Sequence, residues 1–253
     1  MTKHKRKRGH ASRTVQIPLL IMLAMAFLFV MLVLAVIGGW IAPYDYQETN
    51  VVNSLAPPAY SPDGNLNHLL GTDSLGRDVL SRLLLSIRTT VLIAFTGATI
   101  SAMIGTLLGM IAGQVGGFTS NAIMMAVDVQ ASLPFLVFAL TALAILGNSF
   151  LVLLFVIGIS GWESYARLAR GMVLSVMERD FVLAARSLGI TPVALYRRYL
   201  LPNILSALIV QFSISLAGTI LLESALSFLG LGIQLPQTSL GQMLGEGRDF
   251  LLF

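Results

Sequence analysis

The sequence predicts an all-α membrane protein, a polytopic bundle of about five helical spans. Of its 253 residues, 56% are hydrophobic and only 11% are charged, and the mean hydropathy is +0.83. A soluble domain carries roughly 25% charged residues, so we expect most of this chain to lie in lipid. Five runs with few or no charges are each long enough to cross ~30 Å of hydrocarbon as a helix. The positive charges lie beside these runs, in the pattern typical of a membrane protein.

The first predicted span, residues 19–42, follows a basic tail of residues 1–16. The span contains no charged residue, and the tail carries Lys3, Lys5, Arg6, Lys7, Arg8 and Arg13. Positive residues beside a span stay on the cytoplasmic side, so we expect a cytoplasmic N-terminus and an uncleaved signal anchor. A nucleic-acid surface would need aromatic rings among the basic residues, and the tail has none beyond its histidines. We therefore expect no nucleic-acid partner.

Residues 43–89 form a polar loop that we expect on the outer face. They contain four prolines and five acids but only three arginines. In the last part of the loop, Thr72 or Asp73 could cap a helix that runs to Arg88 and has one apolar stripe. We interpret this segment as a helix that lies along the outer membrane interface.

Four more spans are predicted, at residues 90–113, 121–146, 149–168 and 201–226. Counting from a cytoplasmic tail, the fourth span returns the chain to the cytoplasm. The segment around and after its end is rich in arginine, with Arg167, Arg170, Arg179, Arg186, Arg197 and Arg198. Span counting and positive-inside bias therefore agree. Residues 230–253, which are broken by Pro236 and Gly241, should then lie outside together with the C-terminus.

Three features inside the predicted spans could serve packing or transport. Small residues recur at every fourth position, at Gly97, Ser101, Gly105, Gly109 and Gly113; we favour close helix packing over a sliding surface. Asp128 is either a pathway residue or a group that reaches interfacial water, and Pro134 should kink its helix. Glu223 is a further gating candidate, although a place near a span end would also explain Glu223 and Glu163.

The strongest motif is the segment 180–202, which predicts a helix, a turn and another helix. Glycine is favoured directly after the end of a helix, so Gly189 predicts the end of the first helix. Thr191 followed by Pro192 is typical of the N-cap and first residue of a helix, so the pair predicts the start of the second helix. We expect Ala184 and Ala185 to leave room for a partner's groove. Basic side chains surround them, at Arg186, Arg197 and Arg198. The alternatives are a docking element or an ordinary amphipathic hairpin.

The segment resembles the cytoplasmic coupling loop of bacterial ATP-binding-cassette (ABC) importer permeases. That pattern is Glu-Ala-Ala, three residues, Gly, nine residues, Ile, one residue, Leu-Pro. It is matched here by Leu183, Ala184, Ala185, Gly189, Tyr199, Leu201 and Pro202. Leu183 and Tyr199 replace the usual Glu and Ile, so docking should depend on shape and arginines. Segments 68–90 and 223–232 are similar to the dipeptide, oligopeptide and nickel branch, with most likeness to its second, C-type permease.

The resemblance implies that residues 17–253 form a permease domain in the bacterial inner membrane. In this family two permeases form the pathway, two separate ATPases dock on the coupling loops, and an extracytoplasmic binding protein delivers the solute. A P-loop needs a lysine, and no lysine follows Lys7, so ATP is expected on the partner subunits and no catalysis on this chain. Without cysteine, and with scattered histidines, we expect no metal or other cofactor.

The resemblance also implies a sixth span after the segment that begins near Pro236. Only Phe250 to Phe253 are apolar there, so we expect this span to be missing from the chain. The solute is left open among peptides, nickel and glutathione. A self-contained channel or secondary transporter that uses Asp128 is the alternative from another class.

Overall fold

The computed structural model describes residues 18–248 and residue 250, and this part of the chain is built from helices. The basic tail predicted for residues 1–16 lies outside the described residues. The α-helices are α1 (Leu19–Ile41), α2 (Val79–Val115), α3 (Gly117–Ser132), α4 (Phe135–Leu146), α5 (Phe150–Ile159), α6 (Trp162–Met177), α7 (Asp180–Ser187), α8 (Pro192–Leu195), α9 (Leu201–Phe228) and α10 (Leu240–Arg248). Two short turns of other helix types are η1 (Val51–Asn53) and η2 (Tyr196–Leu200).

The predicted number of about five spans is confirmed. Four continuous or joined helical segments are long and apolar enough to cross a membrane, at Leu19–Ile41, Val79–Val115, Phe150–Met177 and Pro192–Phe228. The pair α3 and α4, which bends by 92° at its break, is a fifth candidate if it is counted as one span. Pro134 causes this break as predicted: Leu133 before it has the extended backbone, φ −83° and ψ 127°, that a following proline imposes.

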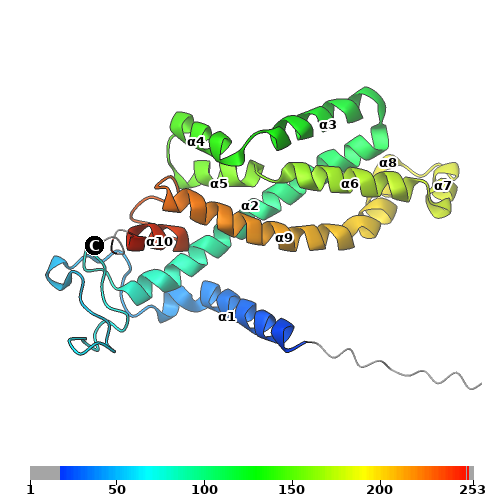
Figure 1. Cartoon of the computed structure of the whole chain (residues 1–253). Coiled ribbons are helices and arrows are strands. Elements are labelled where there is room, and N and C mark those ends of the chain that lie inside the picture. Colours follow the sequence, from blue (N-terminus) through cyan, green and yellow to red (C-terminus); the bar gives the residue numbers. More distant parts are fainter. Residues whose placement is uncertain (1–17, 249, 251–253) are drawn as a thin grey trace, which may run out of the picture.

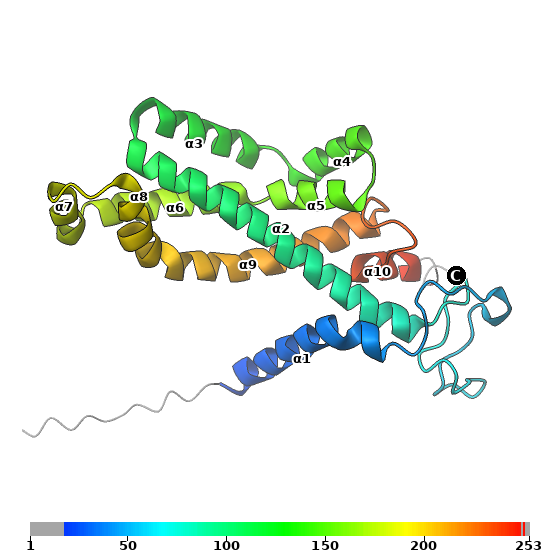
Figure 2. The ribbon, with the colours of Figure 1, turned by 180° about the vertical axis from the view of Figure 1, so that it is seen from behind.

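Helix α2 is the centre of the bundle and has 37 residues. It packs against α1, α3, α5, α6, α9 and α10. Figures 1 and 2 show it running obliquely through the molecule, from the end that carries α10 to the end that carries α7 and α8. Helix α1 contacts α2 where Gly38 lies against the backbone of Leu84, and the rest of α1 diverges from the bundle.

The prediction of an interface helix over residues 72–88 is wrong. Helix α2 begins at Val79, where the Asp78 carboxylate accepts hydrogen bonds from the Ser81 amide and hydroxyl, both at 2.8 Å. It then continues without a break into the span. Two residues of the apolar stripe are covered by protein, since Leu84 is 8% and Ile87 5% exposed. An amphipathic pattern alone does not distinguish a face covered by protein from one at the membrane interface.

The small-residue stripe of α2 packs closely against α5 and α6, as favoured from the sequence. A Cβ added at Gly105 would collide with the Trp162 carbonyl oxygen, and one at Gly109 with that of Ala166. Ser101 donates its hydroxyl to the carbonyl oxygens of Gly158, at 2.8 Å, and of Ser160. The i, i+4 spacing places these residues in one row, which lets the two helix backbones approach each other.

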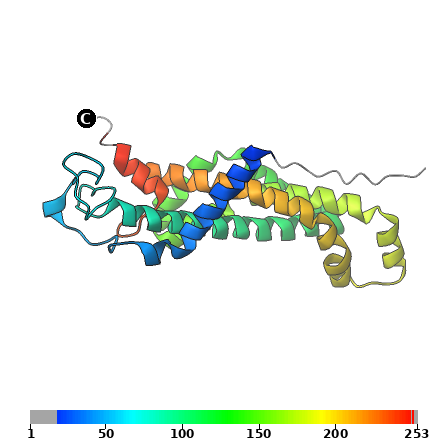
Figure 3. The same cartoon turned by 90° about the horizontal axis from the view of Figure 1, so that it is seen from below.

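The two ends of the bundle carry different structures (Figures 1 and 3). Helices α7 and α8 lie at one end. The loop 43–78 and α10 lie at the other, where α10 packs on α9 and α2. Helix α10 has nine residues and is far shorter than a span.

Candidate functional site

The segment 180–202 folds as a helix, a turn and a second helix, which confirms its predicted structure. Helix α7 ends before Gly189, whose φ of +73° is the left-handed conformation that glycine adopts readily. Thr191 is the N-cap of α8 and Pro192 its first residue. The chain then passes through η2 into α9, where Pro202 occupies the first turn and does not break the helix.

We call residues 180–202 the docking loop, after the role predicted for them. One face of this loop is buried against the end of α6. Val182 and Leu200 are 0% exposed and Leu195 is 2% exposed, in a cluster with Val173 and Val176 of α6. Ala185 is also buried, so it is not on the exposed surface where we expected it. It lies three residues after Val182 and therefore shares the inward face of α7.

The opposite face of the docking loop is apolar and basic. Ala184 is exposed as expected. Leu188 is 83% exposed and Val193 is 66% exposed. Neither residue was predicted to be part of this surface, because the sequence pattern does not distinguish them from other apolar residues of the loop. The other exposed predicted residues are Arg186, Gly189, Pro192, Arg197, Arg198 and Pro202. This surface combines large apolar side chains with positive charge, as protein interfaces often do.

The docking loop is connected to the central helix by side chains. The Tyr196 hydroxyl donates to the Met110 carbonyl oxygen of α2 at 3.4 Å. The rings of Phe181 and Tyr199 stack with centroids 6.3 Å apart, which joins α7 to η2. A force on the loop would therefore reach α2 and α6 through packed contacts rather than through a flexible linker.

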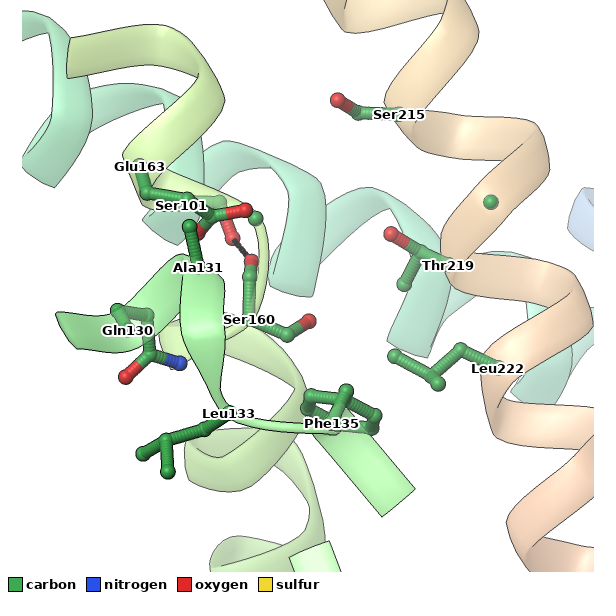
Figure 4. A pocket seen from close by; sticks show the side chains of 12 residues that line it. Ser101, Gln130, Ala131, Leu133, Phe135, Ser160, Glu163, Ser215, Thr219 and Leu222 are labelled. Carbon is green, nitrogen blue, oxygen red and sulfur yellow. Dashed lines mark hydrogen bonds between the residues drawn. The ribbon is translucent and has the colours of Figure 1, made fainter. Parts of the chain in front are cut away.

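A pocket of about 310 Å³ lies in the middle of the bundle, at the break between α3 and α4. Figure 4 shows Ser215, Thr219 and Leu222 of α9 on one side, facing the segment from Gln130 to Phe135 and the α5–α6 junction. Ser101, Ser160 and Glu163 complete its polar lining. Glu163 lies in the candidate span Phe150–Met177, four residues before Arg167, and Ser215 is central in α9. Pockets at broken helices near the membrane centre are where many transporters hold their solute.

The predicted pathway residues are not brought together. Pro134 shapes the pocket through the helix break, but Asp128 is exposed on α3 and is not part of the pocket lining. Glu223 is 0% exposed and accepts a hydrogen bond from Ser227 at 2.7 Å. Ser239, just before α10, donates in turn to the Ser227 hydroxyl at 3.3 Å. In this structure Glu223 helps to hold the segment before α10.

The family of binding-protein-dependent transport system inner membrane components matches residues 105–252. The chain belongs to this family. The match contains the docking loop of the permease and nearly all of its pocket lining. A second family, the N-terminal transmembrane domain of oligopeptide transport permease C, matches residues 20–58, which supports the C-type assignment.

Similar proteins agree with this assignment, and a solved structure shares the fold. The permease is 38% identical to the di/tripeptide transport system permease protein DppC of Pseudomonas aeruginosa, over 89% of this chain and 74% of that protein. It is 35% identical to the oligopeptide transport system permease protein OppC of Haemophilus influenzae, over 90% of this chain and 70% of that one. Its fold resembles a chain of the inward-facing MetNI methionine ABC transporter, with a TM-score of 0.52, 19% identity, and coverage of 68% of this chain and 87% of that chain.

Proposed function

We propose that this permease imports peptides as one membrane subunit of an ATP-driven complex, with the docking loop seated on a separate ATPase. The observation that supports it most directly is the exposed Leu188, between arginines, on an otherwise well-packed loop. Relatives that are 35–38% identical over about nine tenths of the chain are named for dipeptide and oligopeptide transport. The partners are a second permease, two ATPases that bind the ATP, and an extracytoplasmic binding protein.

The proposed mechanism uses the contacts between the loop and the bundle. When ATP closes the ATPase pair, the docking loop moves with the surface that holds it. The buried face of the loop then transmits this motion to α6, and Tyr196 transmits it to α2. The pathway thus has two states, and the bound nucleotide and the loaded binding protein shift the equilibrium between them. The arginine-rich loop and the basic N-terminal tail are on the cytoplasmic side in this proposal.

The docking assignment is tested by Leu188→Asp. Removing a large apolar side chain from an interface and placing a charge there should weaken ATPase binding by at least about tenfold. The measurement is co-purification of the ATPase subunits with the tagged permease in detergent. Leu66→Asp is a matched control, because Leu66 is also 83% exposed but lies in the loop 43–78 at the other end of the bundle.

Recovery of the ATPase at the wild-type level with Leu188→Asp would contradict the docking assignment. The substrate assignment is tested separately, with the complete wild-type complex in proteoliposomes. We expect ATP-dependent uptake of radiolabelled Ala-Ala when the binding protein is present. Gradient-driven uptake by the permease without ATPases would favour a secondary transporter instead.

A further inference from the structure

Glu163 is the ionisable side chain of the pocket at the break between α3 and α4. Among the residues that line the pocket, the others are hydroxyl, amide, glycine or apolar residues. Glu163 lies in the first turn of α6, inside the candidate span Phe150–Met177. At ~1.5 Å per residue, it is about 20 Å from the start of this segment and about 6 Å before Arg167. A carboxylate at that depth is expensive and marks a functional position unless a partner compensates it.

Within the described part of the chain, the helix N-terminus of α6 favours the Glu163 carboxylate, but no ion-pair partner neutralises it. Its Oε2 atom is buried and has no hydrogen-bond partner there. Its Oε1 atom accepts from the neighbouring Ser164 hydroxyl at the long distance of 3.5 Å. The ion pairs in the described residues involve other groups, at the α10 end of the bundle. The carboxylate of Glu163 is therefore able to accept bonds from a cation that enters the pocket.

We propose that Glu163 binds an organic ammonium group of the transported solute as the solute passes through this pocket. This inference rests on the proposed function, in which the solute is a peptide with an α-ammonium group. An ammonium group has three donors. Glu163 would accept one of them, and the oxygens of Ser160, Ser215 and Thr219 in the same lining could accept others.

The pocket chemistry favours an ammonium group over a metal ion. Divalent cations need several oxygen or nitrogen ligands, usually with more than one carboxylate. The described residues contain no group of three His, Cys, Asp or Glu that could hold a metal. Leu133, Phe135 and Leu222 also give the pocket an apolar wall. Such a wall suits the side chain of a small peptide rather than a hydrated ion.

The first test measures uptake. In proteoliposomes with the full complex and the binding protein, Glu163→Gln should reduce Ala-Ala uptake at least about tenfold, since one opposite charge in a partly dry site is removed. Asp63→Asn, which removes an exposed carboxylate from the loop 43–78, should leave uptake unchanged. Equal uptake by Glu163→Gln and wild type would overturn the inference. Failure of the wild type to take up Ala-Ala would instead overturn the proposed function.

The second test needs neither peptide uptake nor a Glu163 variant that folds. The chain has no cysteine, so one introduced thiol reports on its own surroundings. Ser215→Cys places a thiol in the pocket, while Ser213→Cys on the same helix lines a different, apolar groove. Trimethylammonium-ethyl and sulfonatoethyl methanethiosulfonate are the cationic and anionic probes.

The ratio of the cationic to the anionic labelling rate decides the second test. We expect this ratio to be about tenfold higher at position 215 than at position 213, because the Glu163 carboxylate attracts the cationic probe. In a Glu163→Gln background that folds, the excess should disappear. Equal ratios at the two positions would overturn the inference, because they would mean that Glu163 does not attract a cation to this pocket.

Discussion

Arg82 of α2 and Glu246 of α10 form a two-point ion pair, with Nη1–Oε2 at 2.6 Å and Nη2–Oε1 at 3.0 Å. Arg82 is 2% exposed and also donates to Asp73 at 2.5 Å. Asp73 in turn accepts from Arg77 Nε at 2.7 Å. These contacts connect the loop 43–78, the first turns of α2 and the C-terminal helix. We therefore expect Arg82 to be the main attachment point of α10.

Replacing Arg82 by Gln should destabilise the protein more than replacing Glu246 by Gln. Breaking a buried ion pair costs about 3–5 kcal/mol. We expect ~3 kcal/mol for Arg82→Gln and only ~1–2 kcal/mol for Glu246→Gln, because the Glu246 side chain is 35% exposed and solvent screens it. Thermal unfolding in detergent measures the difference. Asp63→Asn is the control and should change stability by less than ~0.5 kcal/mol; equal losses for all three variants would refute the ranking.

Acid should weaken the same cluster in a defined pH range. Burial alone would raise the pKa of Asp73, but the Arg77 and Leu75 amides, the Arg77 side chain and the Arg82 charge outweigh it and lower that pKa below its ordinary value of 3.8. A lowered pKa in the folded state means that ionised Asp73 stabilises the fold fully above the unfolded-state pKa. That contribution is lost as the pH falls through 3.8 towards the folded-state pKa.

The measurement is the unfolding midpoint of wild type and Asp73→Asn as a function of pH. The difference between the two proteins should be constant from about pH 7 to 5 and should shrink below about pH 4. A difference that shrinks already between pH 7 and 5 would mean that the carboxylate is not held in its ionised form by these arginines.

The sequence predicts those features of this fold that depend on local patterns. Uncharged runs predict the spans correctly, because placing a charge in hydrocarbon is costly whatever the arrangement of the neighbouring helices. Pro134 predicted the break and Thr191 with Pro192 the start of α8, since each acts on its own backbone. The same patterns also produced the error over 72–88, where an apolar stripe predicts a buried face but not which surface covers it.

Features that depend on distant segments could not be predicted. The pocket brings together Ser101, Glu163 and Ser215 from three helices, and no spacing in the sequence relates these positions. Glu163 therefore resembled any carboxylate near a span end. Likewise, Ala185 and Leu188 differ in exposure only because α7 turns its Val182 face towards α6. The two residues are only three positions apart in the sequence, and the sequence around them does not indicate which one is buried.

The close contact of α2 with α6 should make Gly105→Ala strongly destabilising. The added methyl group would collide with the Trp162 carbonyl oxygen and lie 2.6 Å from Tyr165 Cβ, and neither can move without shifting a helix. We expect a loss of roughly 1–3 kcal/mol in thermal unfolding, as in other overpacked cores. Gly171→Ala on α6 is the matched control. A Cβ there has nothing within 4 Å, so we expect no loss or a gain of about 0.5–1 kcal/mol.

Gly189 and Gly230 allow the backbone of the docking loop to be tested apart from general stability. Both have a positive φ, of +73° and +78°, and a Cβ at either would meet nothing within 4 Å. Alanine at each position should therefore cost a similar ~1–2 kcal/mol through left-handed backbone strain alone. Gly230 follows α9 at the opposite end of the bundle, whereas Gly189 forms the turn of the docking loop. If this turn fits the ATPase surface, Gly189→Ala should lower the Ala-Ala taken up per ATP hydrolysed several-fold, while Gly230→Ala should keep the wild-type ratio. An equal ratio in both variants, at equal stability, would show that docking does not depend on the shape of this turn.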